Sequence, residues 1–238
     1  LPRLDEDPER SPRYPRLLDD PKYAGRIGAI PAFTPPRPAT DPEIEALLDS
    51  LTLRQRIGQR FIARVQGDRV TYGTGRTIVD VSPAGFIVYP WNFRTADDVR
   101  RLTDSLQFVA SQVTPGISLL LAADQEGGRV ATFRFPEFIR VPSAAALGRF
   151  GDSSLVRSAA YATARQLADL GINMNFAPVL DVYGVADDSI IGDRSFGPDP
   201  RTVAGFVRPY LEASRAAGVI ATAKHFPGHG VTRVDSHT

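Results

Sequence analysis

The sequence predicts an α/β fold, a (β/α)8 TIM-type barrel of which this chain supplies about the first five strands. Short apolar runs alternate with longer amphipathic segments from residue 59 onwards, a pattern typical of parallel β-α-β units. Polar residues directly follow several apolar runs, as expected where barrel strands end on one face. Residues 43–238 are too few to close an eight-stranded barrel, which needs about 250 residues.

The individual elements follow from local signals. Strands are predicted at residues 59–65, 84–89, 118–123, 173–179 and 219–223, and helices at 95–110, 153–171 and 199–218. Thr95 is placed to cap the first of these helices, and Pro209 should kink the last. Two helices precede the barrel strands, because Asp41 is placed to cap one start and Thr52 with Gln55 has capping-box spacing.

The first 42 residues differ from the rest in composition. They hold ten of the twenty prolines, mixed with charged residues. Such a segment forms neither a helix nor a central strand, so residues 1–42 are predicted to be an extended Pro-rich arm before a barrel part at residues 43–238. The arm and the start at Leu1 favour export, to the periplasm or cell surface, over a cytoplasmic location.

The composition of the chain excludes several classes of function and of binding site. The formal net charge of +1 provides no field that would recruit nucleic acid or an anionic membrane. No apolar run approaches the roughly 18 residues of a transmembrane segment. The absence of cysteine excludes disulfides and thiolate metal sites.

Three motifs that follow predicted strands carry candidate binding residues. In "DQEGGRV" Asp124 can accept hydrogen bonds from hydroxyl groups, although a polar turn with an internal Arg129–Glu126 pair is an equally good interpretation. Asp181, at the end of "NFAPVLD", fits a carboxylate that fixes a loop better than a catalyst. Arg194, in "IIGDRSFGPDP", offers a guanidinium fork that suits a hydroxyl-rich or carboxylate ligand.

The last predicted strand runs into a segment that contains all three histidines. Lys224 and His225 leave the strand, His229 lies in a Gly/Pro-rich loop, and Asp235 precedes His237 by two residues. An Asp235–His237 pair suits proton transfer, since the carboxylate can orient the imidazole and raise its basicity. A zinc site and three structural loop histidines are the alternatives, although the spacing matches no helical zinc motif.

Taken together, "DQEGGRV", "NFAPVLDV", "IGDRSFGPDP" and "KHFPGHG" followed by "DSH" resemble glycoside hydrolase family 3. The resemblance covers about residues 50–238, with no counterpart for the arm, and points to the bacterial β-N-acetylglucosaminidases of peptidoglycan turnover. It implies hydrolysis of terminal β-linked N-acetylglucosamine with retention, and no metal or cofactor. It also implies His237 as acid/base paired with Asp235, His229 as a residue that shapes the loop, and sugar binding by Asp124, Arg194, Lys224 and His225.

Two departures from the family pattern qualify this resemblance. Thr132 stands where these enzymes usually carry a sugar-binding arginine, with Arg134 two positions later. The nucleophilic aspartate of the family lies beyond Thr238, so activity would need a C-terminal polypeptide that completes the barrel. The alternatives are a β-glucosidase or glycoside phosphorylase of the same family, a non-catalytic sugar-binding fragment, and a zinc hydrolase.

Overall fold

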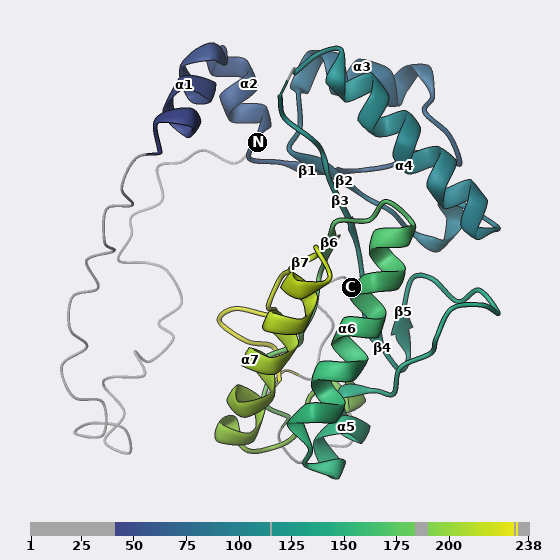
Figure 1. The fold of residues 1–238 in the computed structure, drawn as a ribbon, viewed down its shortest axis with the longest axis vertical. Helices are drawn as coiled ribbons and strands as arrows, with labels where there is room; N and C mark the ends of the chain where they lie inside the picture. Colours follow the sequence, from purple (N-terminus) through teal and green to yellow (C-terminus); the bar gives the residue numbers. More distant parts are fainter. Residues whose placement is uncertain (1–40, 115, 184–189, 231, 233–238) are drawn as a thin grey trace, which may run out of the picture. The chain divides into compact units, whose positions relative to one another are not determined.

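The computed structural model describes residues 41–114, 116–183, 190–230 and 232 (Figure 1). The chain divides into two compact units, Leu1–Glu45 and Ala46–Thr238. The described part of the first unit is the start of α1 (Pro42–Ser50), where the Asp41 carboxylate accepts a hydrogen bond from the backbone N–H of Glu43 at 2.9 Å. This contact confirms Asp41 as the helix cap. The predicted arm, apart from its last two residues, lies outside the described residues.

A five-stranded parallel sheet organises the second unit. The strands are β1 (Ile62–Arg64), β2 (Gly85–Ile87), β3 (Leu120–Ala123), β6 (Met174–Asn175) and β7 (Ile220–Ala221), in the order β1-β2-β3-β6-β7. Phe86 pairs with Leu121, and Asn175 pairs with Ala221. The predicted α/β fold with five parallel strands is confirmed. Within the described residues the sheet remains open, because β1 and β7 are its edges.

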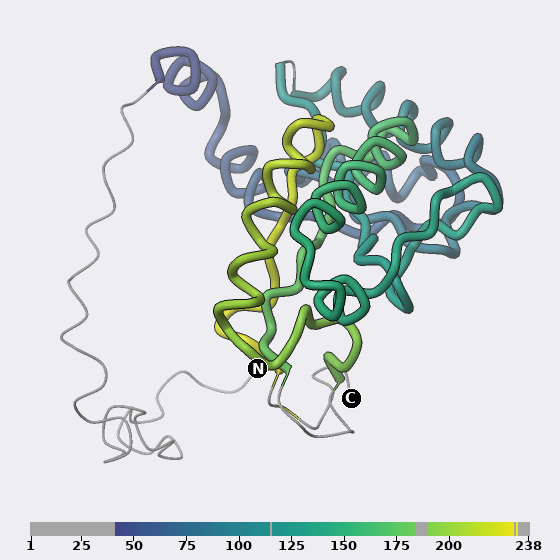
Figure 2. Tube along the Cα trace, turned by 60° about the horizontal axis from the view of Figure 1, so that its bottom comes forward, coloured from purple at the N-terminus to yellow at the C-terminus, as the bar shows by residue number. Residues whose placement is uncertain are grey.

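Helices connect the strands and cover one face of the sheet (Figures 1 and 2). They are α2 (Leu53–Gly58), α3 (Tyr72–Val81), α4 (Ala96–Ser111), α5 (Ala144–Phe150), α6 (Ser153–Asp169) and α7 (Pro200–Ala216), with short 3-10 turns η2 (Pro90–Asn92) and η3 (Gly192–Arg194). The capping boxes at Thr52 and Thr95 are both present. Helix α7 runs through Pro209, and it packs beside α6.

Helices α3 and α5 and a hairpin after β3 were not predicted from the sequence. Helix α3 contains Gly73 and Gly75, which lower helix propensity and hide its signal. The segment after β3 forms a hairpin of β4 (Gln125–Gly127) and β5 (Val130–Ala131) rather than an irregular turn. Its glycines are required, because Gly127 and Gly128 have φ values of 97° and 56°.

The core lies between the sheet and its helices. Phe86, Val88, Leu121 and Ala123 share one cluster of buried side chains with residues of α4 and α6. Since side chains alternate along a strand, Ile87 and Ala122 face the opposite side, which corresponds to the barrel interior. No helix among the described residues is long and apolar enough to cross a membrane.

Candidate functional site

The carboxyl ends of three strands bring the candidate residues together. Asp124 directly follows β3, and Lys224 lies three residues after β7. Val179 forms a parallel bridge to Lys224, so the segments after β6 and β7 stay paired beyond the strands. The Lys224 N–H donates to the carbonyl of Pro178 at 3.0 Å. The backbone therefore fixes where the lysine leaves the sheet.

Lys224 and Arg194 hold two carboxylates in one ionic cluster. The Lys224 Nζ lies 2.7 Å from Asp124 Oδ1 and 2.6 Å from Glu126 Oε1. Arg194 donates from Nε and Nη2 to the two Glu126 oxygens, each at 2.8 Å. Such bidentate pairing fixes both position and orientation of the guanidinium. Glu126 is thus the shared anchor of both cations.

His225 joins the cluster to a buried aspartate. Its Nδ1 lies 2.5 Å from Asp181 Oδ2, and its backbone N–H donates to the same oxygen at 3.2 Å. The Arg194 Nη2 lies 3.4 Å from His225 Nε2. Since an ionised carboxylate only accepts and a guanidinium only donates, these contacts fit the tautomer with its proton on Nδ1.

Asp181 also holds the loop that carries His229. The backbone N–H of His229 donates to Asp181 Oδ1, and Thr232 Oγ1 lies 2.6 Å from His229 Nδ1. The His229 ring meets the His225 ring edge-on, with centroids 5.9 Å apart. The interpretation of Asp181 as a carboxylate that fixes a loop agrees with these contacts.

Burial and charge together set the ionisation of this cluster. Burial alone would raise the pKa of Glu126, but hydrogen bonds from Arg194 and the charge of Lys224 hold that pKa below its ordinary value. Burial likewise opposes ionisation of Asp181, whose pKa is nevertheless lowered by His225 and by the His229 N–H. Hydrogen bonding to Glu126 raises the pKa of Arg194. The site thus favours the charged forms of Glu126, Asp181 and Arg194.

A buried amide clamps the strand end that presents Asp124 and Glu126. Asn175 Oδ1 accepts from the Gln125 N–H, and its Nδ2 donates to the Gln125 carbonyl, both at 3.0 Å. The same Nδ2 lies 3.3 Å from the hydroxyl of Tyr210 on α7. Burial, and then the charge of Glu126, raises the pKa of the Tyr210 hydroxyl, so the phenol remains neutral. The Asn175 side chain thus replaces backbone hydrogen bonds between β6 and the segment after β3, where the backbone pairing of these strands ends.

Arg129 holds the hairpin against the segment that carries Arg194. Its Nε lies 2.9 Å from Asp193 Oδ1, and its Nη2 donates to the carbonyls of Ile190 and Ile191 at 2.6 and 3.0 Å. The alternative of an internal Arg129–Glu126 pair is therefore wrong. Arg129 pairs with Asp193 of η3, while Glu126 pairs with Arg194 and Lys224.

Thr132 and Arg134, the residues of the first departure from the family pattern, have structural roles in the hairpin. Thr132 is buried, and its Oγ1 donates to the Asp124 carbonyl at 3.0 Å. Arg134 donates to the carbonyls of Ala131 and Arg129. Both side chains are engaged with backbone carbonyls of the hairpin.

The structure brings together four residues predicted to bind sugar: Asp124, Arg194, Lys224 and His225. Asp235 and His237 lie outside the described residues. Glu126 was not among the site residues predicted from the sequence. Its signal was its position two residues after Asp124, since residues two apart along a strand share a face.

Accessible groups in the cluster can bind hydroxyl groups. Asp124 is 32% exposed, whereas Glu126 is 6% exposed, so Asp124 presents its second oxygen to a ligand. The ammonium of Lys224 has three N–H donors, of which two face carboxylates. Among the described residues no three His, Cys, Asp or Glu side chains are grouped to hold a metal ion. Paired donors and acceptors on a rigid frame suit a polyhydroxylated neutral ligand.

Comparisons with known proteins point in the same direction. The family model described as "Glycosyl hydrolase family 3 N terminal domain" matches residues 52–238. A beta-hexosaminidase of Aromatoleum aromaticum is 35% identical over 180 residues, which are 73% of this chain and 49% of the relative. The beta-hexosaminidase LpqI of Mycobacterium tuberculosis is 33% identical over 227 residues, 95% of this chain and 52% of the relative.

A solved structure shows the same relationship. A glycoside hydrolase family 3 beta-N-acetylglucosaminidase from Paenibacillus sp. aligns with a TM-score of 0.75 and 37% identity, over 79% of this chain and 35% of that chain. This chain spans about half the length of the two curated relatives. The alignment with LpqI covers 95% of the chain and so includes most of residues 1–42. The expectation that the arm has no counterpart was wrong.

Proposed function

This chain belongs to glycoside hydrolase family 3, and from this premise we propose that it supplies the sugar-binding half of a retaining β-N-acetylglucosaminidase. The substrate would be a cell-wall or chitin-type saccharide with a terminal β-linked N-acetylglucosamine. The observation that carries this proposal is the cluster in which Lys224 bridges Asp124 and Glu126 while Arg194 bridges Glu126 and His225.

Each accessible group of this cluster has a defined task toward the sugar. Asp124 accepts hydrogen bonds from ring hydroxyls, while Lys224 and Arg194 donate to hydroxyl or acetamido oxygens. His225 is held by Asp181 and offers its remaining ring edge. Glu126 stays behind the cations and keeps their charges compensated. Because these partners are fixed before the ligand arrives, little side-chain entropy is lost on binding.

The chemical step is assigned to two residues near the end of the chain and one outside it. We place His237, oriented by Asp235, as the acid/base that protonates the glycosidic oxygen and later removes a proton from water. A carboxylate nucleophile, carried by a polypeptide beyond Thr238, attacks the anomeric carbon and forms the covalent intermediate. We assign neither Glu126 nor Asp181 as the nucleophile, because both carboxylates are held by cationic or N–H donors.

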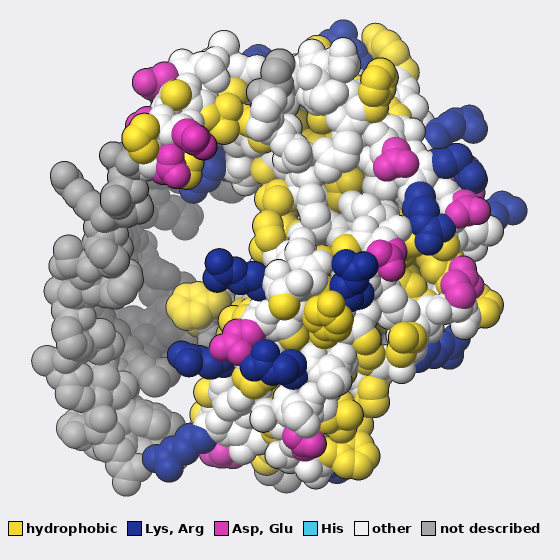
Figure 3. Space-filling view, viewed as in Figure 1, with side chains coloured by type: hydrophobic (Ala, Val, Ile, Leu, Met, Phe, Trp, Pro, Cys, Tyr) yellow, Lys and Arg dark blue, Asp and Glu magenta, His cyan; other side chains and the backbone are white. Residues whose placement is uncertain are grey.

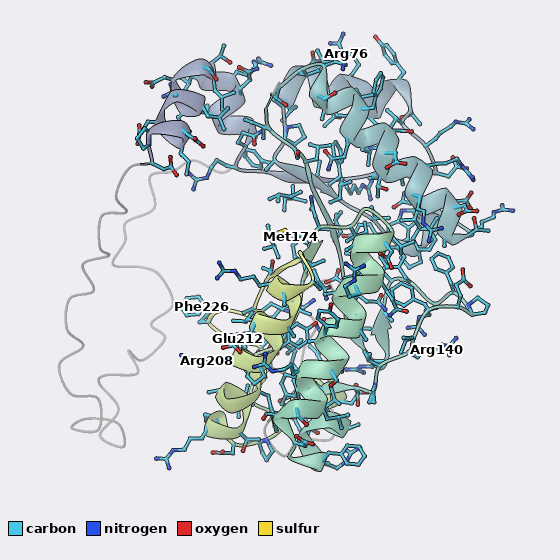
Figure 4. The ribbon with its side chains drawn as sticks, in the orientation of Figure 1. Arg76, Arg140, Met174, Arg208, Glu212 and Phe226 are labelled. Carbon is cyan, nitrogen blue, oxygen red and sulfur yellow. The ribbon has the colours of Figure 1, made fainter. Side chains whose placement is uncertain are left out.

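An additional polypeptide that completes the barrel is the partner we propose. The sheet ends at β7, where Ile220 is half exposed, and Phe226 is 97% exposed in the loop that follows. Figure 4 labels Phe226, which projects outward from its loop. Parallel strands are normally buried on both sides, so further strands would cover these apolar groups. We also propose that residues 1–42 form an arm separate from the barrel part at 43–238.

Hydrolysis of chromogenic glycosides by the intact protein tests the proposed function. We expect release from an aryl β-N-acetylglucosaminide in preference to the matching β-glucoside, without acceleration by phosphate. His237→Ala should lower kcat by about 10²- to 10⁴-fold with little change in ground-state sugar binding, since acid/base groups contribute about that much.

The outcomes separate the alternatives. Preference for the β-glucoside, or a sugar phosphate as product, would assign the protein to another activity of the family. Binding of N-acetylglucosamine without any turnover would identify a non-catalytic sugar-binding protein. Full activity of His237→Ala would remove the acid/base assignment.

A further inference from the structure

One charged side chain stands in a row of apolar side chains that crosses the parallel sheet. The strand register joins one residue from each strand into this row, which consists of Arg64, Ile87, Ala122, Met174 and Ile220. Arg64 belongs to the edge strand β1 and is exposed, as is Ile220 on the other edge strand, β7. Arg64 is thus the row's only charged member.

This row lies on the side of the sheet that corresponds to the barrel interior. Ala63 and Val65, the neighbours of Arg64 along β1, pack in the core cluster that includes residues of α4. Since successive side chains of a strand point to opposite faces, Arg64 points away from those helices. Ala221 packs in the same way against the cluster that includes residues of α6 and α7, so Ile220 also points away from helices. The charge of Arg64 therefore faces the barrel interior.

The guanidinium of Arg64 has no ionic partner among the described residues. It makes no ion pair or side-chain hydrogen bond to any of them, whereas Arg194 pairs with Glu126 at 2.8 Å. The side chains that follow Arg64 along the row are Ile87 and Ala122, which offer no acceptor. A charge in an apolar interior is costly unless it is paired. Covering this face of the sheet would therefore require an acceptor for Arg64.

The edge of the sheet at β1 is open to a further strand. Within the described part of the chain β1 pairs with β2 alone, so its other side can accept another strand. Apolar side chains beside this edge are also uncovered, since Ile57 of α2 is 53% exposed and Phe61, which precedes β1, is 57% exposed. Figure 3 shows hydrophobic side chains along the hollowed side of this unit, between α2 and α7. A further element of the barrel would bury such groups.

We propose that Arg64 forms an ion pair with a carboxylate on the strand that the completing polypeptide places beside β1. The carboxylate belongs to an aspartate or glutamate whose side chain points into the barrel at the level of the row. The pair fixes the register of the added strand, because a slip by one residue would turn the carboxylate outward and leave Arg64 buried without a partner. This inference rests on the completing polypeptide of the proposed function, and it specifies the chemistry of the contact with β1.

A zero-length cross-link in the intact protein tests the pair. Arg64→Lys provides a primary amine at this position, and a water-soluble carbodiimide joins an amine to a contacting carboxylate through an amide bond. The background is low because the chain has only two lysines, Lys22 and Lys224. Lys224, whose Nζ lies 2.7 Å from Asp124 Oδ1, is the internal positive control.

Mass spectrometry of the digested protein identifies the carboxylate. We expect a cross-link from position 64 to an aspartate or glutamate of the completing polypeptide, and none from this position when the protein is treated in urea. A cross-link from position 64 to a carboxylate of this chain, in the same or in a second copy, would overturn the proposal. So would the absence of any cross-link from position 64 when the Lys224 control is present.

Urea unfolding of the intact protein tests the charge of Arg64. Arg64→Met removes the charge and leaves the carboxylate buried without a partner, so the folded-to-unfolded ratio should fall at least about 100-fold. Arg64→Lys keeps the charge and should lose no more than about tenfold. Arg140→Met, at an exposed arginine labelled in Figure 4, is the matched control and should change the ratio less than about threefold. Equal effects of Arg64→Met and Arg140→Met would show that Arg64 remains solvated and would overturn the proposal.

Failure of this proposal is distinguishable from failure of the proposed function. Hydrolysis of an aryl β-N-acetylglucosaminide by the intact protein, with no cross-link from position 64 in Arg64→Lys, would overturn the Arg64 pair alone. The expected cross-link in a protein that neither binds nor hydrolyses N-acetylglucosaminides would support the pair and contradict the proposed function.

Discussion

Replacing Glu126 by glutamine should destabilise the protein, because this carboxylate compensates two cations at once. The change keeps the size of the side chain and removes its charge. Glu126 accepts two bonds from Arg194 and one contact from Lys224, at 2.6 to 2.8 Å, with 6% of its side chain exposed. Hydrogen bonds to charged groups contribute about 1.5–3 kcal/mol each. Gln keeps one acceptor oxygen but turns an NH₂ group toward a cation.

The expected loss lies at the lower end of the range for breaking a buried ion pair. That range is about 3–5 kcal/mol. Both cations retain some contact with water, and Lys224 keeps its pair with Asp124. We therefore expect a free energy of unfolding about 3 kcal/mol below the parent. Equilibrium unfolding in urea at neutral pH measures it.

The matched control is Glu212→Gln on α7, labelled in Figure 4. Glu212 pairs with Arg157 at 2.5 Å, but both side chains are about half exposed. Exposed pairs contribute about 0–1 kcal/mol, so this variant should remain close to the parent. If Glu126→Gln lost no more stability than Glu212→Gln, the reasoning about the ionic cluster would be refuted.

Three further predictions follow from the same contacts. The folded state lowers the pKa of Glu126 from its ordinary value of 4.5, so the stability that the ionised Glu126 contributes should be lost as the pH falls below 4.5. The free energy of unfolding of Glu126→Gln should therefore decrease less steeply in acid than that of the parent, and equal pH dependence of the two proteins would contradict this. Asn175→Ala leaves both backbone groups of Gln125 without their partner, so the free energy of unfolding should fall by about 2–4 kcal/mol in urea titrations, with weaker sugar binding in calorimetry. Thr95→Ala removes the cap of α4 and should cost about 1 kcal/mol in thermal unfolding followed by circular dichroism, whereas an unchanged midpoint would show that the cap contributes nothing.

Local signals were sufficient for most of the fold. The capping boxes at Thr52 and Thr95 act within four residues, so they are visible in the sequence and present in the structure. The apolar runs marked all five strands, because parallel strands are buried on both faces and lack competing polar residues. Helix α3 escaped prediction since its helical state depends on packing against α4 rather than on propensity.

Four of the clustered site residues were predicted from the sequence, whereas Glu126 and the pairing of the side chains were not. Strand ends indicated that Asp124 and Lys224 would meet, because parallel strands present their carboxyl ends at one edge. One of the two interpretations of the motif paired Arg129 with Glu126, and this pairing was wrong. Arg129 pairs with Asp193 instead, and the choice between these two carboxylates depends on where η3 packs. The bidentate Arg194–Glu126 pair spans 68 residues and arises from the fold alone. Asp235 and His237 remain predictions.

Calorimetric titration of this chain with N-acetylglucosamine tests the central claim most directly. The proposal predicts saturable binding that falls at least about tenfold in Asp124→Ala, equivalent to about 1.4 kcal/mol, and is unchanged in Glu212→Gln. Parental affinity in Asp124→Ala, or no binding by the parent chain, would contradict the assignment of the Asp124, Glu126, Arg194, Lys224 and His225 cluster as the sugar site.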